Sequence, residues 1–178
     1  MCENKQVRQK ENIHILPIKP VEQTNGYECG LSSVMTILKA LGVKPSKAKL
    51  KEMLGTNSKA GTSPDRIKAL FDGLDVTYEE KYGSNLKEIE KMLKTSKMCL
   101  VAYQAWGNEK EYAKLLSGHY SVIFGFENEY LWLADPAVHK ENARYGKGLR
   151  KIKKETFLAR WKDVDFAGKV YERWMLGV

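Results

Sequence analysis

Among the residues that can do nucleophilic chemistry, Cys29 stands out by its surroundings. It is flanked by Glu28 and Gly30, and it directly precedes an apolar pattern with helical spacing. A cysteine at a helix N-terminus lies beside unpaired backbone N–H groups and the positive end of the helix dipole, which stabilise a thiolate. Gln23 lies six residues upstream, so its side-chain amide can donate to an oxyanion beside the sulfur. These features favour a nucleophile over a buried cysteine that packs as a small hydrophobe.

A thiol nucleophile requires a base, and His119 has the best setting of the three histidines. His14 lies among apolar residues, where a structural role is expected, and His139 lies in a lysine-rich loop that disfavours an imidazolium. His119 opens the strand pattern HYSVIFGF, which would hold it on a rigid element. Asp135 ends the following strand, and in an antiparallel hairpin these two ends are neighbours. We therefore expect the Asp135 carboxylate to accept the Nδ1–H of His119.

The apolar spacing predicts the elements that position these residues. Helices are expected from Cys29 to Leu41, over Ser46–Leu54, from Ser63 to Gly73, from Asn85 to Leu93, and briefly around Phe157 and Trp161. Strands are expected over Ile13–Ile18, Leu74–Tyr78, Met98–Tyr103, Tyr120–Phe126, Tyr130–Ala134 and Lys169–Leu176, with a basic loop insertion over Val138–Leu149. Helices come first and strands later, which is typical of an α+β fold.

Capping residues support the predicted start of three of these helices. Ser63 precedes Pro64 and an acidic residue, and Asn85 stands three residues before Glu88, as in a capping box. Ser46 is the expected cap of its own helix, on which the lysines fit a solvated face.

Composition narrows the class of protein. The 178 residues fit one domain over 13–178 after a polar tail over 1–12, which is expected to be disordered. The net charge of +8 suggests nucleic acid, but no zinc-finger, RRM or helix-turn-helix signature accompanies it, so nucleic-acid binding is not expected. No apolar run approaches the roughly 18 residues of a membrane span, so membrane insertion is not expected. Three separated cysteines are not a disulfide framework, which indicates the cytoplasm.

Four segments resemble the bacteriocin-processing peptidases, the papain-like domains that remove double-glycine leader peptides. QTNGYECGLSSVMTILKALG is similar to their nucleophile segment, GTSPDRIKALFDGLDV to their Gly-Thr-Ser turn and helix, SGHYSVIFGFENEYLWLADPA to their His–strand–Asp-Pro hairpin, and ETFLARW to their closing Phe-xxx-Trp. The likeness covers residues 13–165. It implies a papain-like α+β fold in which an N-terminal helical part packs on a C-terminal antiparallel sheet.

The resemblance also implies roles for particular residues. Gln23, Cys29, His119 and Asp135 fall on the family's oxyanion-hole and catalytic positions. We expect Gly61 and Thr62, in the Gly-Thr-Ser turn, and Gly118, just before the base, to contact substrate. Glu28 departs from the Asp that commonly precedes the nucleophile. A peptide or protein substrate is the expected partner, together with a separately encoded membrane transporter.

Two other functions would use the same fold. An acyltransferase would need the same four residues, whereas a papain-like module that binds peptides without cutting them would not need all of them. Metal binding lacks the usual ligand spacing, and no cofactor is indicated. The sequence therefore predicts a cysteine peptidase, and the basic surface suggests acidic or extended substrates.

Overall fold

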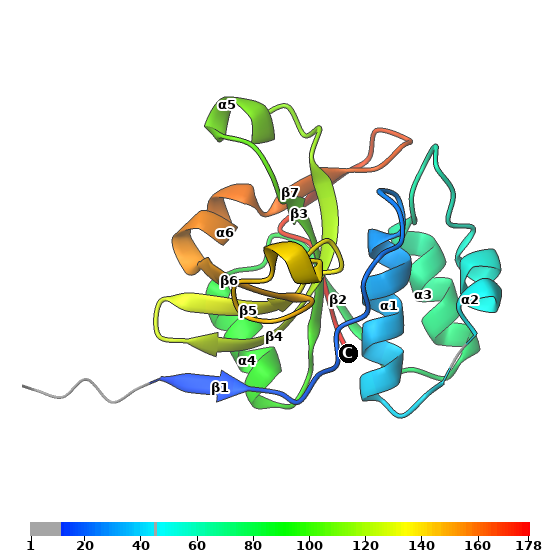
Figure 1. The fold of residues 1–178 in the computed structure, drawn as a ribbon, viewed down its shortest axis with the longest axis horizontal. Coiled ribbons are helices and arrows are strands. Elements are labelled where there is room, and N and C mark those ends of the chain that lie inside the picture. The colour runs from blue at the N-terminus through cyan, green and yellow to red at the C-terminus, as the bar shows by residue number, and fades with distance from the viewer. Residues whose placement is uncertain (1–11, 45) are drawn as a thin grey trace, which may run out of the picture.

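A computed structural model describes residues 12–44 and 46–178, and its helices lie on both faces of an antiparallel sheet (Figure 1). The expected tail over 1–12 lies outside the described residues, apart from Asn12. On one face lie α1 (Cys29–Ala40), α2 (Lys47–Leu54) and α3 (Pro64–Gly73). On the other face lie α4 (Leu86–Lys94) and α6 (Lys154–Arg160), while α5 (Glu109–Tyr112) is a short turn of helix.

The main sheet has seven strands, all paired antiparallel. Its order is β2 (Glu79–Lys81), β9 (Met175–Gly177), β3 (Cys99–Gln104), β4 (Gly118–Glu127), β5 (Tyr130–Ala134) and β6 (Leu149–Lys153), with β1 (Ile13–Ile15) paired to the far end of β4. A separate hairpin is formed by β7 (Lys162–Val164) and β8 (Val170–Glu172).

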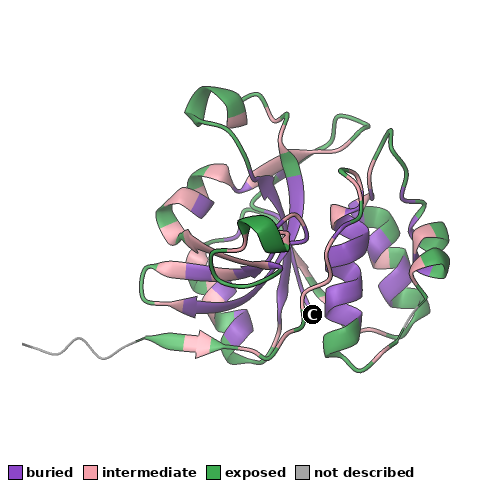
Figure 2. Ribbon diagram, viewed as in Figure 1, coloured by how far each residue is buried: buried purple, intermediate pink, exposed green. Residues whose placement is uncertain are grey.

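The period-two alternation of strand side chains divides the core into two halves. On β3, Leu100 and Ala102 face α1, whereas Cys99, Val101 and Tyr103 face α4 and α6. Because both faces of β3 are covered, the strand reads as an unbroken apolar run, as its sequence predicted. Figure 2 shows α1 buried along most of its length, which fixes the helix that carries the candidate nucleophile.

The helix predictions are confirmed, with one difference in capping. Ser63 accepts a hydrogen bond from the Asp65 N–H, and Asn85 and Glu88 form a complete capping box. Ser46 occupies the N-cap position of α2 with an extended backbone, but its side chain makes no capping hydrogen bond.

Two strand predictions need correction, and one edge strand was missed. The strand expected over Leu74–Tyr78 is wrong because the chain turns at Asp75, where φ is 53°, and pairing starts only at Glu79. The single strand expected over Lys169–Leu176 is two strands, broken at Arg173, whose φ is 46°. Strand β6 was not predicted, because its alternating lysines and arginine resemble a basic loop. Charged side chains of this kind are common on edge strands.

Within residues 12–44 and 46–178, no helix combines the length and apolar character needed to cross a membrane.

Candidate active site

The candidate nucleophile is the first residue of the buried helix α1. Cys29 is partly exposed, whereas the next nine residues of the helix are buried. Gly30 lets the chain around Thr62 approach closely, because a Cβ at position 30 would lie 2.7 Å from the Thr62 Cβ. The helix start is therefore held against both the sheet and the loop before α3.

The segment that carries Gln23 is tied to both layers of the molecule. The Val21 N–H donates to the Thr36 hydroxyl (3.0 Å) on α1. The Gln23 N–H donates to the Pro136 carbonyl (3.0 Å), one residue beyond Asp135. Gln23 is 9% exposed, and its Oε1 accepts no hydrogen bond from the part of the chain that the structure describes. The segment thus links the nucleophile helix to the end of β5.

His119 and Asp135 are brought together as the hairpin predicted, but through the other ring nitrogen. His119 Nε2 lies 2.8 Å from Asp135 Oδ1, and both side chains are buried. The expectation of an Nδ1 contact is wrong. Val122 pairs with Ala134, so Asp135 lies two positions along the ladder from His119 and meets the far side of the ring. This leaves Nδ1 as the ring nitrogen available to Cys29.

The electrostatics of this pair favour an ion pair. Burial lowers the pKa of His119, but hydrogen bonding to Asp135 and Cys29 outweighs it and raises the pKa to about 9. Burial raises the pKa of Asp135, but His119 and Arg150 outweigh it and hold the pKa below its ordinary value. Arg150 Nε lies 2.6 Å from Asp135 Oδ2, an ion pair without the alignment of a hydrogen bond. Imidazolium and carboxylate are therefore the expected states at neutral pH.

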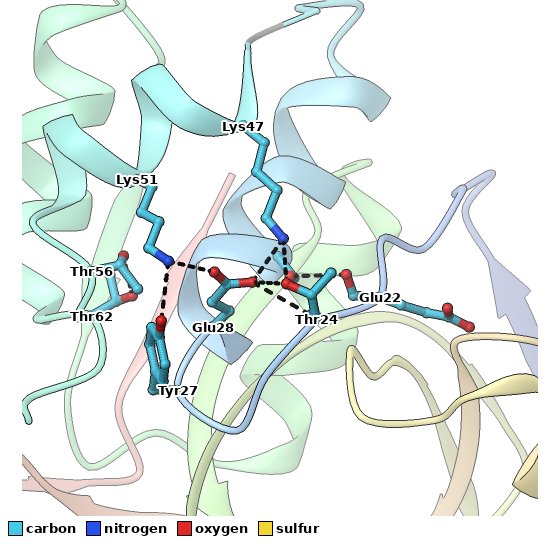
Figure 3. Close-up of polar contacts among 9 residues, drawn as sticks. Glu22, Thr24, Tyr27, Glu28, Lys47, Lys51, Thr56 and Thr62 are labelled. Atoms are coloured by element: carbon cyan, nitrogen blue, oxygen red, sulfur yellow. Dashed lines mark hydrogen bonds and ion pairs between the residues drawn. The ribbon is translucent and has the colours of Figure 1, made fainter. Parts of the chain in front are cut away.

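A second buried carboxylate stands directly before the nucleophile (Figure 3). Glu28 is 2% exposed and accepts hydrogen bonds from the Thr24 hydroxyl (2.6 Å), Lys47 (2.7 Å) and Lys51 (2.8 Å). Burial raises the pKa of Glu28, but the two lysines and Thr24 outweigh it and hold the pKa far below its usual range. The lysine pattern predicted a solvated face for this helix, and the cluster around Glu28 was not predicted. The i, i+4 spacing of the two lysines was the available signal.

A cavity of about 300 Å³ opens beside Cys29. Gly61, Thr62 and Gly118 all line it, so the three residues expected to contact substrate lie together next to the candidate nucleophile. Asp163 also lines it, and burial raises the pKa of this carboxyl to about 6. Its short segment carries no recognisable motif, and the sequence analysis missed it. Residues 12–44 and 46–178 contain no group of three His, Cys, Asp or Glu side chains placed to hold a metal ion.

A cysteine at the start of a buried helix, beside a histidine and a carboxylate on an antiparallel sheet, is the arrangement of papain-like cysteine peptidases. The sequence model of the Peptidase C39 family matches residues 17–166, and the chain belongs to this family. The protein is thus a cysteine-type peptidase, and the predicted enzyme class and fold class are confirmed.

The chain is also similar to solved structures in its fold and to a curated relative in its sequence. The fold is similar to a C39-like peptidase from Bacillus anthracis, with a TM-score of 0.68, 16% identity and coverage of 93% of this chain and 97% of that one. It is also similar to the double-glycine motif protease of an AMS/PCAT transporter in complex with its leader peptide, with a TM-score of 0.57, 19% identity and coverage of 92% and 91%. An uncharacterized protein of Methanothermobacter marburgensis is 27% identical over 70% of this chain and 75% of its own length.

Proposed function

We propose that the protein hydrolyses a peptide bond with Cys29 as nucleophile, His119 as general acid and base, and Asp135 as the residue that orients His119. The buried His119–Asp135 pair, joined at 2.8 Å, carries this proposal, together with the contribution of Cys29 at the start of α1 to the raised pKa of His119. A histidine with a raised pKa supplies the imidazolium that a thiolate needs as its partner.

In the acylation step, the Cys29 sulfur attacks the carbonyl carbon of the substrate. The carbon–nitrogen bond breaks as the His119 imidazolium donates its proton to the leaving amine, and a thioester remains on Cys29. The neutral imidazole then takes a proton from water, which attacks the thioester. The carbon–sulfur bond breaks, and the acid product leaves while the thiolate and imidazolium return.

The oxyanion of each tetrahedral intermediate would be stabilised by two donors, the Cys29 backbone N–H and the Gln23 side-chain amide. The first N–H groups of a helix have no intrahelical acceptor, which leaves the Cys29 N–H available. The hydrogen bond from the Gln23 backbone to Pro136 supports its placement, because it ties this segment to the strand end that carries Asp135.

The substrate class follows from the cleft and from the relatives. The cavity lined by Gly61, Thr62 and Gly118 would hold an extended peptide beside Cys29. One similar structure is in complex with a leader peptide, and another is the peptidase domain of Streptococcus ComA, a bifunctional ABC transporter. By analogy, we infer that a peptide or protein is cut here in the cytoplasm, in cooperation with a membrane transporter.

Alkylation tests the nucleophile. Iodoacetamide at about pH 6, well below the pKa of a free thiol, should modify Cys29 selectively. The rate should fall by about 10-fold or more in His119→Ala and stay unchanged in the control His139→Ala, because only His119 supplies the counter-ion. Mass mapping of the modified cysteines gives the readout. Equal modification of Cys29 and of the buried Cys99, or an unchanged rate in His119→Ala, would contradict the proposal.

A peptide-library digest tests the reaction itself. Cleavage by the wild-type protein should be absent in Cys29→Ala. Thioester transfer to an added amine instead of water would identify the acyltransferase alternative.

A further inference from the structure

The cleft beside Cys29 has a charge opposite to that of the molecule. The chain carries a net charge of +8, yet the charged residues that line this cavity are Asp163 and Asp165, with no lysine or arginine among the described residues that line it. The expectation of acidic substrates, drawn from the basic surface, therefore does not suit this cleft.

Asp163 is held in a fixed position with one oxygen left over. Its Oδ1 accepts hydrogen bonds from the Gln104 side chain (2.9 Å) and from the Val164 N–H (2.8 Å). Gln104 is in turn fixed by the Ser117 N–H, which donates to its Oε1 (2.8 Å). Across the described ranges, neither a hydrogen-bond donor nor a cation is paired with Asp163 Oδ2. One carboxylate oxygen is therefore available to a ligand.

The carboxylate also lies next to the catalytic histidine. It occupies the space that a side chain at Gly118 would need, since a Cβ there would be 2.7 Å from Asp163 Oδ2. Gly118 directly precedes His119 on β4, and Asp163 and Cys29 line the same cavity, so a charge at Asp163 lies close to the bond that Cys29 would cut. Burial raises the pKa of Asp163 to about 6, and the group is still mainly an anion at neutral pH.

Asp165 differs because its oxygens are already used. Its Oδ1 accepts from the N–H groups of Ala167 and Lys169, and its Oδ2 accepts from the Tyr171 hydroxyl. The β7–β8 hairpin also exposes apolar surface, since Phe166 is 76% exposed and lines the same cavity. In Figure 1 this hairpin extends beyond the sheet on the side of the helical layer. An apolar rim above a single carboxylate oxygen suits a long basic side chain, whose methylene stem packs while its charged end is bound.

We propose that Asp163 is a specificity residue that binds a lysine or arginine side chain of the substrate next to the scissile bond. This inference rests on the proposed function of the Cys29 site and adds a substrate class to it. A single free oxygen allows a monodentate contact, so lysine and arginine should both be accepted.

Matched peptides test the specificity. Pairs of peptides that differ only in lysine against norleucine, placed in turn at each position flanking the cleaved bond, are compared by kcat/KM. At one position the wild-type protein should prefer lysine by about 10- to 100-fold, the range of a charge-assisted hydrogen bond. In Asp163→Asn, which keeps an acceptor for Gln104 and Val164, the ratio should fall close to one. Glu155→Gln, a change at an exposed glutamate, is the control and should keep the preference.

A second measurement does not depend on cleavage. Cys29 is labelled by a cationic and by an anionic methanethiosulfonate of similar size, the trimethylammonium-ethyl and sulfonatoethyl reagents. Asp163→Asn should lower the ratio of the cationic to the anionic rate by about fivefold, as expected for the loss of one nearby charge.

The outcomes separate the two proposals. Peptides cut with no basic preference, or a preference that survives Asp163→Asn, overturn the role of Asp163 while hydrolysis stands. If no peptide is cut but the labelling ratio falls in Asp163→Asn, hydrolysis fails while the cation-selective cleft is supported. A labelling ratio that is unchanged by Asp163→Asn overturns the inference in either case.

Discussion

Two buried carboxylates belong to the candidate active site and its surroundings, and they differ in the groups that bind them. Glu28 precedes Cys29 and is bound by lysines whose side chains are 36% and 35% exposed. Asp135 is completely buried and is bound by His119, which is 1% exposed, and by Arg150. Glu28 joins the turn before the nucleophile to α2, whereas Asp135 is bonded to the candidate base itself.

This difference in binding partners indicates a structural role for Glu28 and a chemical role for Asp135. Removing the charge of Glu28 leaves the base untouched and should act mainly on the stability of the turn that holds Gln23 and Cys29. Removing the charge of Asp135 changes the ring that would transfer the proton. The same functional group, a buried carboxylate, should therefore give a folding defect when it is removed at Glu28 and a chemical defect when it is removed at Asp135.

The largest expected effect is the loss of catalysis in Asp135→Asn. Activity should fall by about 10²- to 10⁴-fold, because the amide neither stabilises an imidazolium nor holds the ring orientation. The measurement is kcat/KM on a cleaved peptide, with the free energy of unfolding measured in parallel. A fall of less than tenfold would show that the two carboxylates do not differ in the way described.

Glu28→Gln should show the opposite pattern. We expect a loss of about 1–3 kcal/mol in the free energy of unfolding, since two lysine ammonium groups lose their anionic partner. Because the pKa of Glu28 is lowered by folding, its charge contributes stability above the ordinary glutamate pKa of about 4.3 and loses that contribution as the pH falls below it.

Urea unfolding at pH 7 and in steps below pH 4.5 checks the effect of Glu28→Gln. The difference in the free energy of unfolding between the wild-type protein and the variant should become smaller as the pH falls. A difference that stays constant with pH would mean that Glu28 stabilises the fold through its packing and not through its charge.

The titration of His119 gives a second test of the comparison between Glu28 and Asp135. Its ring should remain an imidazolium up to about pH 9 in the wild-type protein. Asp135→Asn should lower this pKa, whereas Glu28→Gln should leave it nearly unchanged, because Asp135 and Cys29 are the side chains that raise it most. NMR of ¹³C-labelled histidine across pH 5–10 gives the readout. An equal change in the pKa of His119 in both variants would contradict the distinction between a structural Glu28 and a catalytic Asp135.

The smallest expected effects come from the lysines of α2. Lys47→Met and Lys51→Met should each lower the free energy of unfolding only slightly, and by less than Glu28→Gln, because a partly exposed pair is screened by water and the other lysine remains. The double variant should cost more than the sum, since Glu28 would then be buried without a cation. Lys49→Met, on an exposed position of the same helix, is the matched control. Additive effects would contradict this account of the cluster.

Tertiary structure decided the contacts between distant segments. The use of Nε2 by His119 depends on the register between β4 and β5, which places Asp135 two positions along the ladder. The lysines of α2 were predicted to be solvated, because the spacing of the apolar residues in this helix indicates only which face packs. It does not indicate that a buried Glu28 lies opposite the lysines. Asp163 lies beside Gly118 only because the β7–β8 hairpin packs against the end of β3, where the Gln104 side chain donates to Asp163. Gln104 and Asp163 are far apart in the sequence.

The sequence by itself determined the features that depend on neighbouring residues. The start of α1 at Cys29, the caps of α3 and α4, and the hairpin that carries His119 and Asp135 are all local, because i, i+3 and i, i+4 contacts and short turns involve residues close in the chain. Side chains that meet across long loops are selected by the packing of whole layers, which no local pattern records. The catalytic candidates could therefore be predicted from sequence, while the groups that tune them and the charge of the cleft required the fold.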